Sequence, residues 1–184
     1  IKEFQLGFAE KDEKNTNEFF KKNNLSKTDL KNLGLLSERG NFLFKNRIIF
    51  PITNLRNETV GFGGRAIDDF GPKYLNTAES SIYRKNRTLY FTSEFLSDVK
   101  KKKFVILVEG YFDVIAFNKL GFNNVASPSG TALTVQQINL LSRYTKEVYL
   151  CFDNDAAGDS ASKRVLEIKN NQPSDCLLYT SDAA

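Results

Sequence analysis

The chain has 184 residues, of which 41% are hydrophobic and 26% charged, and no apolar run is long enough to cross a bilayer, so we expect one or two globular domains. It contains no His and only two Cys, which argues against a Cys/His zinc site within the chain and against a disulfide framework. Residues 1–103 carry 20 Lys and Arg against 13 Asp and Glu, and residues 104–184 carry 6 against 9. This split suits a polyanion partner and a carboxylate-rich metal site, although lysines scattered over a solvated surface would produce it equally well.

The first forty residues predict two polar helices. Their apolar residues recur at roughly helical spacings: Phe19, Phe20, Leu25, Leu30, Leu33, Leu35 and Leu36. Ser26 or Thr28 is expected to cap the second helix, and Gly34 or Gly40 to mark its end. Because the chain begins at Ile1 and contains no Met, we expect it to be part of a longer protein.

Residues 41–103 change character and predict a β-rich unit. The segments FLFKNRIIFPITN and ETVGFGGRAI are rich in β-branched and aromatic residues and are separated by the turn-prone NLRNE. A mixed region of loops and strands follows, and TSEFLSDVKKKK predicts a short helix. The lysine run of residues 100–103 is expected to mark a subdomain boundary and to be a solvated linker.

From Phe104 onward, short apolar strands alternate with helices. FVILVEG, NVASPSG and EVYLCFD predict strands, and each is followed by a predicted helix. This alternation indicates an α/β fold with a parallel sheet, helices on both faces and right-handed crossovers. The final QPSDCLLYTSDAA does not continue the rhythm, so we expect residues 172–184 to be a non-native tail outside the fold.

Two of the three predicted strands end in acidic residues. Glu109 follows the first strand, and Asp153 and Asp155 follow the third. Since the carboxyl ends of parallel strands meet at one edge of a sheet, these carboxylates are expected to converge, and Asp113 is expected to face the same cavity. Repulsion between close acids favours a bound cation, and Mg²⁺ fits because it prefers oxygen ligands. Helix capping would explain one aspartate without any metal, most easily Asp155.

The sequence around these acids resembles a known family. VEGYFDVIAFNKLGFNNVASPSGTALT and CFDNDAAGDSASKRVLE, with 43 residues between Glu109 and Asp153, resemble the Toprim domain of bacterial DnaG-type primases. Upstream, FKNRIIFPI, GFGGRAI and PKYLNTAESSIYRKNRTLYF resemble the basic amino-terminal subdomain of the same polymerase core. The resemblance covers about residues 1–171. It implies a Rossmann-like parallel sheet with flanking helices in residues 104–171, preceded by a mixed α+β basic subdomain in residues 1–103.

The resemblance also implies a groove for the template and the nucleotide. The residues that match its positions are Lys45, Arg47, Arg65, Lys73, Tyr74, Asn76 and Lys85. Arg offers two parallel hydrogen bonds to a phosphate and Lys a point charge, which suits polyanionic substrates. Tyr74 and Tyr83 would either stack on bases or belong to the core, and the glycines of GFGG would allow either a close backbone approach or a hairpin turn.

Residues 129–131, after the second predicted strand, offer a further choice. Their backbone N–H groups would bind a phosphate, or they would simply lead into the next helix, with Thr131 or Thr134 as its cap. We favour the plain helix entry.

By this resemblance the chain is expected to be a DNA primase core, a nucleotidyltransferase and DNA-directed RNA polymerase that makes short RNA primers for replication. Glu109, Asp153 and Asp155 would hold Mg²⁺ or Mn²⁺, with Glu109 acting as base or as ligand. The implied partners are single-stranded DNA, ribonucleoside triphosphates and, through a carboxy-terminal region that this sequence lacks, the replicative helicase. Zinc is implied only for a missing amino-terminal domain. A monomeric, cytoplasmic protein without membrane contact is expected.

Three alternatives compete with this hypothesis. Another Toprim enzyme would break phosphodiester bonds, as a nuclease or topoisomerase does, but PKYLN favours a primase and no topoisomerase tyrosine is identified. A phosphotransferase with a nucleophilic Asp is disfavoured because the first strand ends in Glu109. The third alternative is a non-catalytic module that binds single strands. The last acidic motif of the Toprim family is not matched around Asp175, so the chain alone is expected to bind metal weakly and to be inactive.

Overall fold

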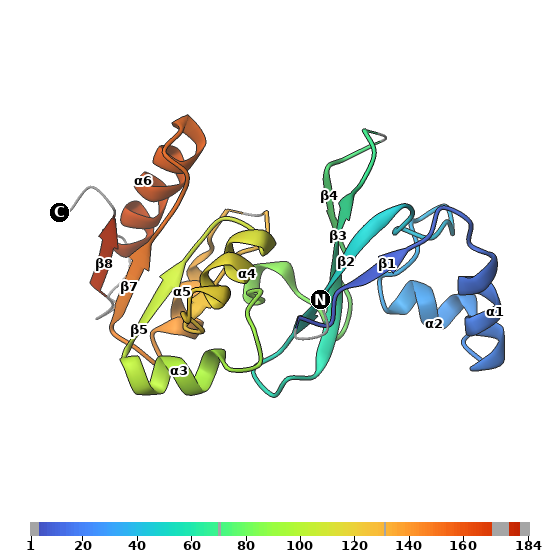
Figure 1. The fold of residues 1–184 in the computed structure, drawn as a ribbon, viewed down its shortest axis with the longest axis horizontal. Coiled ribbons are helices and arrows are strands. Elements are labelled where there is room, and N and C mark those ends of the chain that lie inside the picture. Colours follow the sequence, from blue (N-terminus) through green and yellow to red (C-terminus); the bar gives the residue numbers. More distant parts are fainter. Residues whose placement is uncertain (1–3, 70, 131, 171–176, 181–184) are drawn as a thin grey trace. The chain divides into compact units, whose positions relative to one another are not determined.

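The structure is a computed structural model that describes residues 4–69, 71–130, 132–170 and 177–180. The chain forms two compact units, Ile1–Arg84 and Lys85–Ala184 (Figure 1). Residues 85–103 thus belong to the second unit by their contacts, while a domain division after Lys103 stays a prediction. In the described part of the chain, no helix is both long and apolar enough to cross a membrane.

Two short helices open the first unit, α1 (Lys14–Lys22) and α2 (Lys27–Asn32). Ser26 caps α2, because its Oγ accepts from the Asp29 N–H at 3.1 Å while Asp29 Oδ2 accepts from the Ser26 N–H at 2.8 Å. Gly34 follows the helix with a φ of +69°, and a Cβ there would overlap the Ala78 carbonyl oxygen. The predicted cap and the predicted stop are both confirmed.

An antiparallel sheet forms the rest of the first unit. Its strands are hydrogen-bonded in chain order: β1 (Gly7–Ala9), β2 (Arg47–Thr53), β3 (Thr59–Ala66) and β4 (Tyr74–Asn76). The β2–β3 hairpin turns at NLRNE as predicted, since Asn54 Oδ1 accepts from the N–H groups of Arg56 and Glu58. Phe50 and Ile52 of β2 are almost completely buried, which places the core on their face of the sheet.

The glycines of GFGG lie inside β3 and admit aromatic neighbours rather than forming a turn. A Cβ on Gly61 would lie 3.0 Å from the Tyr83 ring, and one on Gly64 would lie 2.6 Å from the Phe44 ring. Residues three apart face opposite sides of a strand, so the two buried rings pack on opposite faces of β3. The structure therefore favours a close approach of other residues to the β3 backbone over a hairpin turn at these glycines.

A parallel sheet organises the second unit, and the predicted α/β fold is confirmed. Its strands β5 (Phe104–Leu107), β6 (Val125–Ala126), β7 (Glu147–Leu150) and β8 (Leu177–Thr180) lie in the order β6-β5-β7-β8. Helices α4 (Tyr111–Lys119), α5 (Val135–Leu141) and α6 (Ala156–Asn170) follow β5, β6 and β7 in turn. Val105 and Leu107 of β5 and Val148 and Leu150 of β7 are buried in the core.

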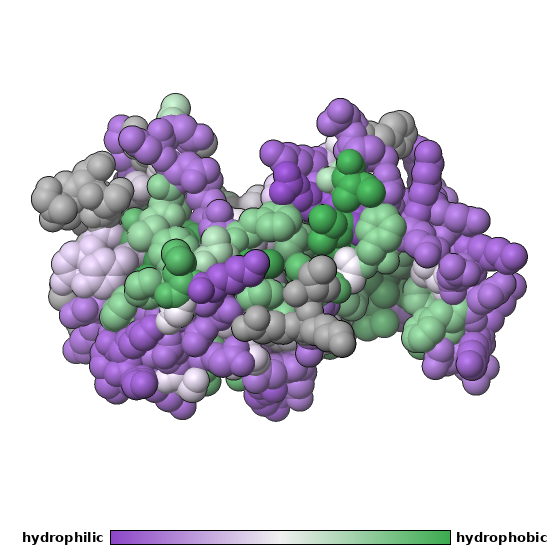
Figure 2. Space-filling view, in the orientation of Figure 1, coloured by the Kyte–Doolittle hydropathy of each residue, from purple (hydrophilic) through white to green (hydrophobic). Residues whose placement is uncertain are grey.

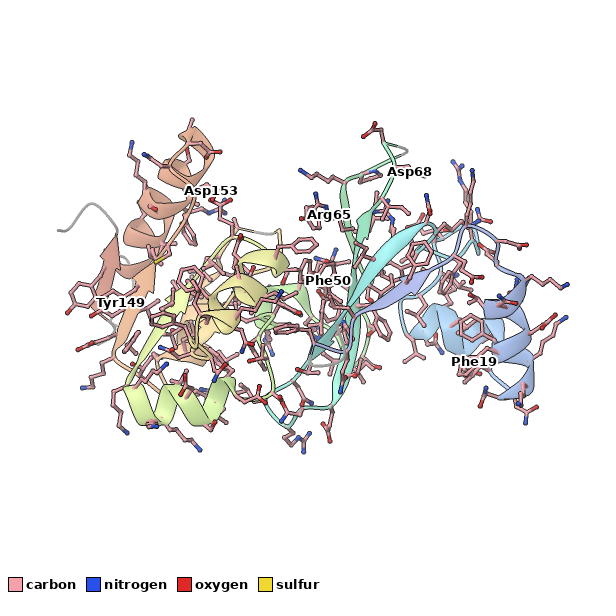
Figure 3. The ribbon with its side chains drawn as sticks, in the orientation of Figure 1. Phe19, Phe50, Arg65, Asp68, Tyr149 and Asp153 are labelled. Carbon is pink, nitrogen blue, oxygen red and sulfur yellow. The ribbon has the colours of Figure 1, made fainter. Side chains whose placement is uncertain are left out.

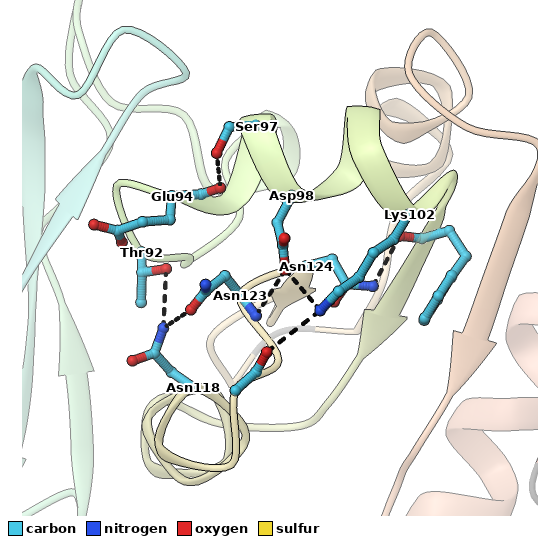
Figure 4. Close-up of polar contacts among 10 residues, drawn as sticks. Thr92, Glu94, Ser97, Asp98, Lys102, Asn118, Asn123 and Asn124 are labelled. Carbon is cyan, nitrogen blue, oxygen red and sulfur yellow. Dashed lines mark hydrogen bonds and ion pairs between the residues drawn. The ribbon is translucent and has the colours of Figure 1, made fainter.

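The lysine run of residues 100–103 forms the last turn and the C-cap of α3 (Phe95–Lys102) rather than a linker. Lys102 Nζ pairs with Asp98 at 2.8 Å and donates to Asn124 Oδ1 at 3.2 Å (Figure 4). These contacts fix α3 to the loop before β6. The other three lysines are exposed, and α3 presents a hydrophilic surface in Figure 2.

The strand β8 lies in the segment that we expected outside the fold. It pairs in parallel with β7, with Glu147 opposite Leu177 and Leu150 opposite Thr180. The expectation is corrected for this strand, because a short apolar run can satisfy the otherwise unpaired edge of β7. Whether residues 172–184 are native stays a prediction, and Asp175 lies outside the described residues.

Candidate metal centre and nucleic-acid interface

Three neighbouring strands of the parallel sheet end beside one another. β5 leads into Glu109, β6 into Ser127 and β7 into Asp153. The Cys151 N–H donates to the Leu107 carbonyl at 2.8 Å, which continues the β5–β7 pairing one residue past the end of β7. Parallel sheets place their binding sites at this edge, and here the edge carries two of the predicted acids.

Glu109 and Asp153 are in direct contact. The Asp153 N–H donates to Glu109 Oε1 at 3.0 Å. On the other side, the Ser127 hydroxyl donates to the Glu109 carbonyl oxygen at 2.7 Å, so the end of β6 supports the backbone of this acid. Glu109 is partly exposed and Asp153 is exposed, and both residues are therefore accessible to a ligand from solvent. Figure 3 labels Asp153 beside the start of α6.

Gly158 allows the loop after β7 to approach Glu109. A Cβ on Gly158 would overlap the Asp153 carbonyl oxygen and would lie 3.2 Å from Glu109 Oε1. Gly158 is buried, so a larger residue fits only if the backbone moves. The contact between Glu109 and Asp153 therefore depends on a glycine in the first turn of α6.

The other two predicted acids cap helices. Asp155 Oδ1 accepts from the Gly158 N–H at 2.8 Å and so caps α6, as the capping alternative predicted. Asp113 Oδ2 accepts from the Gly110 N–H at 2.8 Å at the start of α4. Each carboxylate thus has one oxygen bound to backbone, and each negative charge lies near a helix N-terminus, where it is stabilised.

The donor chemistry of this edge suits a hard divalent cation, although the predicted acids do not form a cage. Among the described residues, no group of three or more His, Cys, Asp or Glu side chains could hold a metal ion. Mg²⁺ commonly uses one or two protein carboxylates and takes its other ligands from water and substrate phosphates. Glu109 and Asp153 fit that pattern as two acids at the same edge of the sheet, joined through the Asp153 backbone N–H.

Arg65, Tyr74 and Asn76 lie on one face of the antiparallel sheet in the first unit. Arg65 of β3 is paired with Tyr74 of β4, and its guanidinium carbon lies 5.7 Å from the centre of the Tyr74 ring. Asn76 is two residues from Tyr74 and so faces the same side. Tyr74 is 38% exposed, whereas Tyr83 is only 2% exposed and belongs to the core.

Arg47 and Lys45 both have partners within the first unit. Arg47 is 4% exposed, and its Nη1 donates to the carbonyls of Gly64 at 3.3 Å and Lys73 at 3.4 Å. Burial lowers the pKa of the Arg47 guanidinium, and the charge of Asp68 partly offsets this effect. Lys45 pairs with Glu13 at 2.7 Å. Arg47 thus connects β2, β3 and the segment that leads into β4.

The remaining predicted residues are placed separately. Lys73 is exposed just before β4. Lys85 is partly exposed and begins the 3-10 turn η1 (Lys85–Arg87) of the second unit. Thr134 Oγ1 accepts from the Gln137 N–H at 3.2 Å, which confirms Thr134 as the cap of α5, while Thr131 lies outside the described residues.

Ser127 and Gly158 were not predicted to serve the site. Ser127 follows the second parallel strand as Glu109 follows the first, so its position after a strand was the available signal. Gly158 occurs in the first turn of a helix, where glycine is unfavourable, and such a residue signals a close contact.

Comparison with known proteins identifies two matching families. Residues 1–96 match the family described as DNA primase catalytic core, N-terminal domain, and residues 106–182 match the Toprim-like family. The first match covers the antiparallel sheet with Arg65 and Tyr74. The second covers the sheet edge with Glu109 and Asp153.

Bacterial DNA primases are similar to the chain over most of its length. Those of Rickettsia bellii and Aquifex aeolicus are 42% and 40% identical over 172 and 171 residues, and each alignment covers 91% of this chain. The chain spans 28% and 34% of the length of those two primases.

Solved primase structures share the fold. The zinc-binding and RNA polymerase domains of the Aquifex aeolicus primase superpose with a TM-score of 0.86 at 38% identity, over 96% of this chain and 44% of that chain. A DnaG primase catalytic domain bound to ssDNA superposes with a TM-score of 0.85 at 34% identity, over 98% of this chain and 58% of that chain.

Proposed function

The chain belongs to the family of DNA primase catalytic cores, and from this we propose that it carries the nucleotidyl-transfer centre of a primase, which makes short RNA primers on single-stranded DNA. The observation that supports this most is the contact between Glu109 and Asp153 at the carboxyl edge of a parallel sheet. Both residues lie in the part of the chain that matches the Toprim-like family, and parallel sheets have their binding sites at this edge.

The proposed reaction joins two ribonucleotides. The 3′-oxygen of one attacks the α-phosphate of the next, a new P–O bond forms, and pyrophosphate leaves with the electrons of the broken bond. A divalent cation, Mg²⁺ or Mn²⁺, would lower the pKa of the hydroxyl and neutralise charge on the phosphates. Glu109, Asp153 and Asp155 are the proposed ligands, and Glu109, if it acts as the base instead, would take the hydroxyl proton.

The basic residues have a matching role in this proposal. Arg65 and Lys73 would bind phosphates of the template or nucleotide, and the exposed ring of Tyr74 would stack on a base. Because Arg47 is buried with its N–H groups on backbone carbonyls, we assign it to holding the Lys73 segment rather than to direct contact. The helicase partner and the cytoplasmic location stay predictions.

Primer synthesis by a full-length primase that contains this chain tests the proposal. With single-stranded DNA, the four ribonucleoside triphosphates and Mg²⁺, we expect short RNA complementary to the template. Omission of the template or removal of the cation by a chelator should abolish the product. Cleavage of the DNA instead of RNA synthesis would indicate a nuclease or topoisomerase, and DNA binding without any reaction would indicate a binding module.

A further inference from the structure

Gln137, in the first turn of α5, is completely buried and reaches a distant turn of the chain. Its Nε2 donates to the Lys85 carbonyl at 3.0 Å and to the Thr88 carbonyl at 2.7 Å, and its Oε1 accepts from the Thr134 N–H at 3.0 Å. Both amide hydrogens and the amide oxygen are therefore used. Because carbonyl oxygens only accept hydrogen bonds, the two carbonyls identify the atom of the Gln137 amide that faces them as the nitrogen.

Thr134 holds the carbonyl that lies between these two contacts. Its hydroxyl donates to the Asn86 carbonyl at 2.7 Å while accepting from the Gln137 N–H. Three of the four carbonyls in residues 85–88 are thus bound by side chains that lie 48 to 52 residues further along the chain. The backbone of residues 85–88 cannot change much without breaking at least one of these hydrogen bonds.

The turn held in this way is strongly basic. Arg84, Lys85 and Arg87 fall within four residues, and η1 is only three residues long, so it has little helical hydrogen bonding of its own. A fixed backbone reduces the conformational entropy that these cations lose when they bind a polyanion. An apolar side chain at position 137 would fill the same space but could not bind the carbonyls.

We propose that Gln137 is a positioning residue, which fixes the turn of residues 85–88 so that Lys85 is held ready for a phosphate of the template or nucleotide. The role of Lys85 as a phosphate ligand rests on the proposed function. The hydrogen bonds that Gln137 and Thr134 make to the carbonyls of Lys85, Asn86 and Thr88, which we call the clamp, do not depend on that function. Gln137 touches no substrate in this account and acts through Lys85.

The test compares Gln137→Met with Gln136→Met in the full-length protein. Met has a similar length but no N–H donors, and Gln136 is the exposed neighbour on the same helix. We expect Gln137→Met to speed amide hydrogen exchange of the peptide covering residues 84–90 by about tenfold, since the Thr88 N–H to Lys85 carbonyl bond loses its support. Gln136→Met should leave that exchange unchanged. Equal exchange in the two variants would overturn the clamp whether or not the protein is a primase.

A double-mutant cycle tests whether the clamp acts through Lys85. The Kd for a fluorescent oligothymidine and the Kd for ATP are measured separately in Gln137→Met, Lys85→Ala and the double variant. We expect Gln137→Met to weaken one of these affinities by about tenfold, and to add nothing once Lys85 is Ala. Fully additive effects, or unchanged affinity for both probes, would overturn the positioning role even if the enzyme still makes primers.

A milder pair covers the case in which Gln137→Met does not fold. Thr134→Val removes the hydroxyl that binds the Asn86 carbonyl, and Thr134→Ser keeps it. Faster exchange of residues 84–90 in the Val variant alone supports the clamp, and equal exchange in both variants contradicts it.

Discussion

At the scale of single residues, the contact between Glu109 and Asp153 depends on the absence of a side chain at Gly158. A Cβ there would overlap the Asp153 carbonyl oxygen, which is backbone and cannot rotate away. The predicted site therefore rests on a residue that carries no functional group.

Gly158→Ala should consequently displace the loop after β7. We expect the free energy of unfolding to fall by about 1–3 kcal/mol and primer synthesis to fall by more than about tenfold, because the Asp153 backbone must move away from Glu109. Urea unfolding and a primer assay measure the two effects. The control is Gly7→Ala, where the new Cβ meets only Ile49 at 3.7 Å. Equal behaviour of the two variants would contradict the close approach.

Asp155 has two candidate roles, and two substitutions separate them. Asn also caps helices, so Asp155→Asn should keep the stability of α6 within about 0.5 kcal/mol, whereas Asp155→Ala should lose about 1 kcal/mol. Both variants should lose primer synthesis if the carboxylate is a metal ligand. Full activity in Asp155→Asn would leave Asp155 as a helix cap only.

At the scale of elements, the glycines of β3 leave room for aromatic rings of the first unit to pack against the strand. Gly61 lies against Tyr83 and Gly64 against Phe44, on opposite faces of the strand. The existence and order of these strands could be predicted from β-branched runs and turn residues. These particular pairs could not, since a single sequence does not indicate which distant ring meets which glycine.

Gly64→Ala should overpack β3 against Phe44. We expect a loss of about 1–3 kcal/mol in the free energy of unfolding, because the new methyl would lie 2.6 Å from the Phe44 ring. The smaller side chain in Phe44→Leu should make the Gly64→Ala substitution less costly in the double variant. Strictly additive losses in a double-mutant cycle of urea unfolding would show that the two residues do not meet.

The Tyr83 ring that covers Gly61 should make the stability of the first unit fall at alkaline pH. Burial, assisted by the charge of Glu79, raises the pKa of Tyr83 to about 12 from its ordinary value near 10. The folded state favours the neutral phenol, so this stability is complete below pH 10 and is lost as the pH rises from about 10 to 12. We expect the wild type to lose about 2 kcal/mol more than Tyr83→Phe over that window. Urea unfolding at about pH 10 and about pH 12 measures the free energy of unfolding of both proteins. An equal loss in the wild type and in Tyr83→Phe would contradict a buried phenol.

At the scale of the whole molecule, the division into units changes the meaning of the charge pattern. Split after Arg84, the two parts carry 14 Lys and Arg against 11 Asp and Glu, and 12 against 11. The basic excess of the first 103 residues came largely from residues 85–103, which pack with the second unit. Net charge per half is therefore a weak guide to polyanion binding here, and named positions such as Arg65 and Lys85 carry that hypothesis.

The sequence predicted the α/β fold and the meeting of strand ends because both follow from local patterns, namely apolar strands alternating with helices and acids placed directly after strands. It also anticipated the capping alternative for Asp155. The burial of Arg47 and the clamp made by Gln137 depend on partners 17 or more residues away, which periodicity does not reveal. The role of Gly158 depends on how closely the backbone after β7 approaches Glu109, and the sequence alone does not show that distance.

Primer synthesis by a full-length primase carrying Asp153→Asn in this chain tests the central claim most directly. Asn keeps the size of the side chain and removes the charge that would hold the cation, so we expect Mg²⁺-dependent synthesis to fall by about 100-fold. The exposed neighbour Asn154→Ala should retain synthesis and thereby control for general damage to the loop. Unchanged synthesis in Asp153→Asn would contradict the assignment of this sheet edge as the catalytic centre.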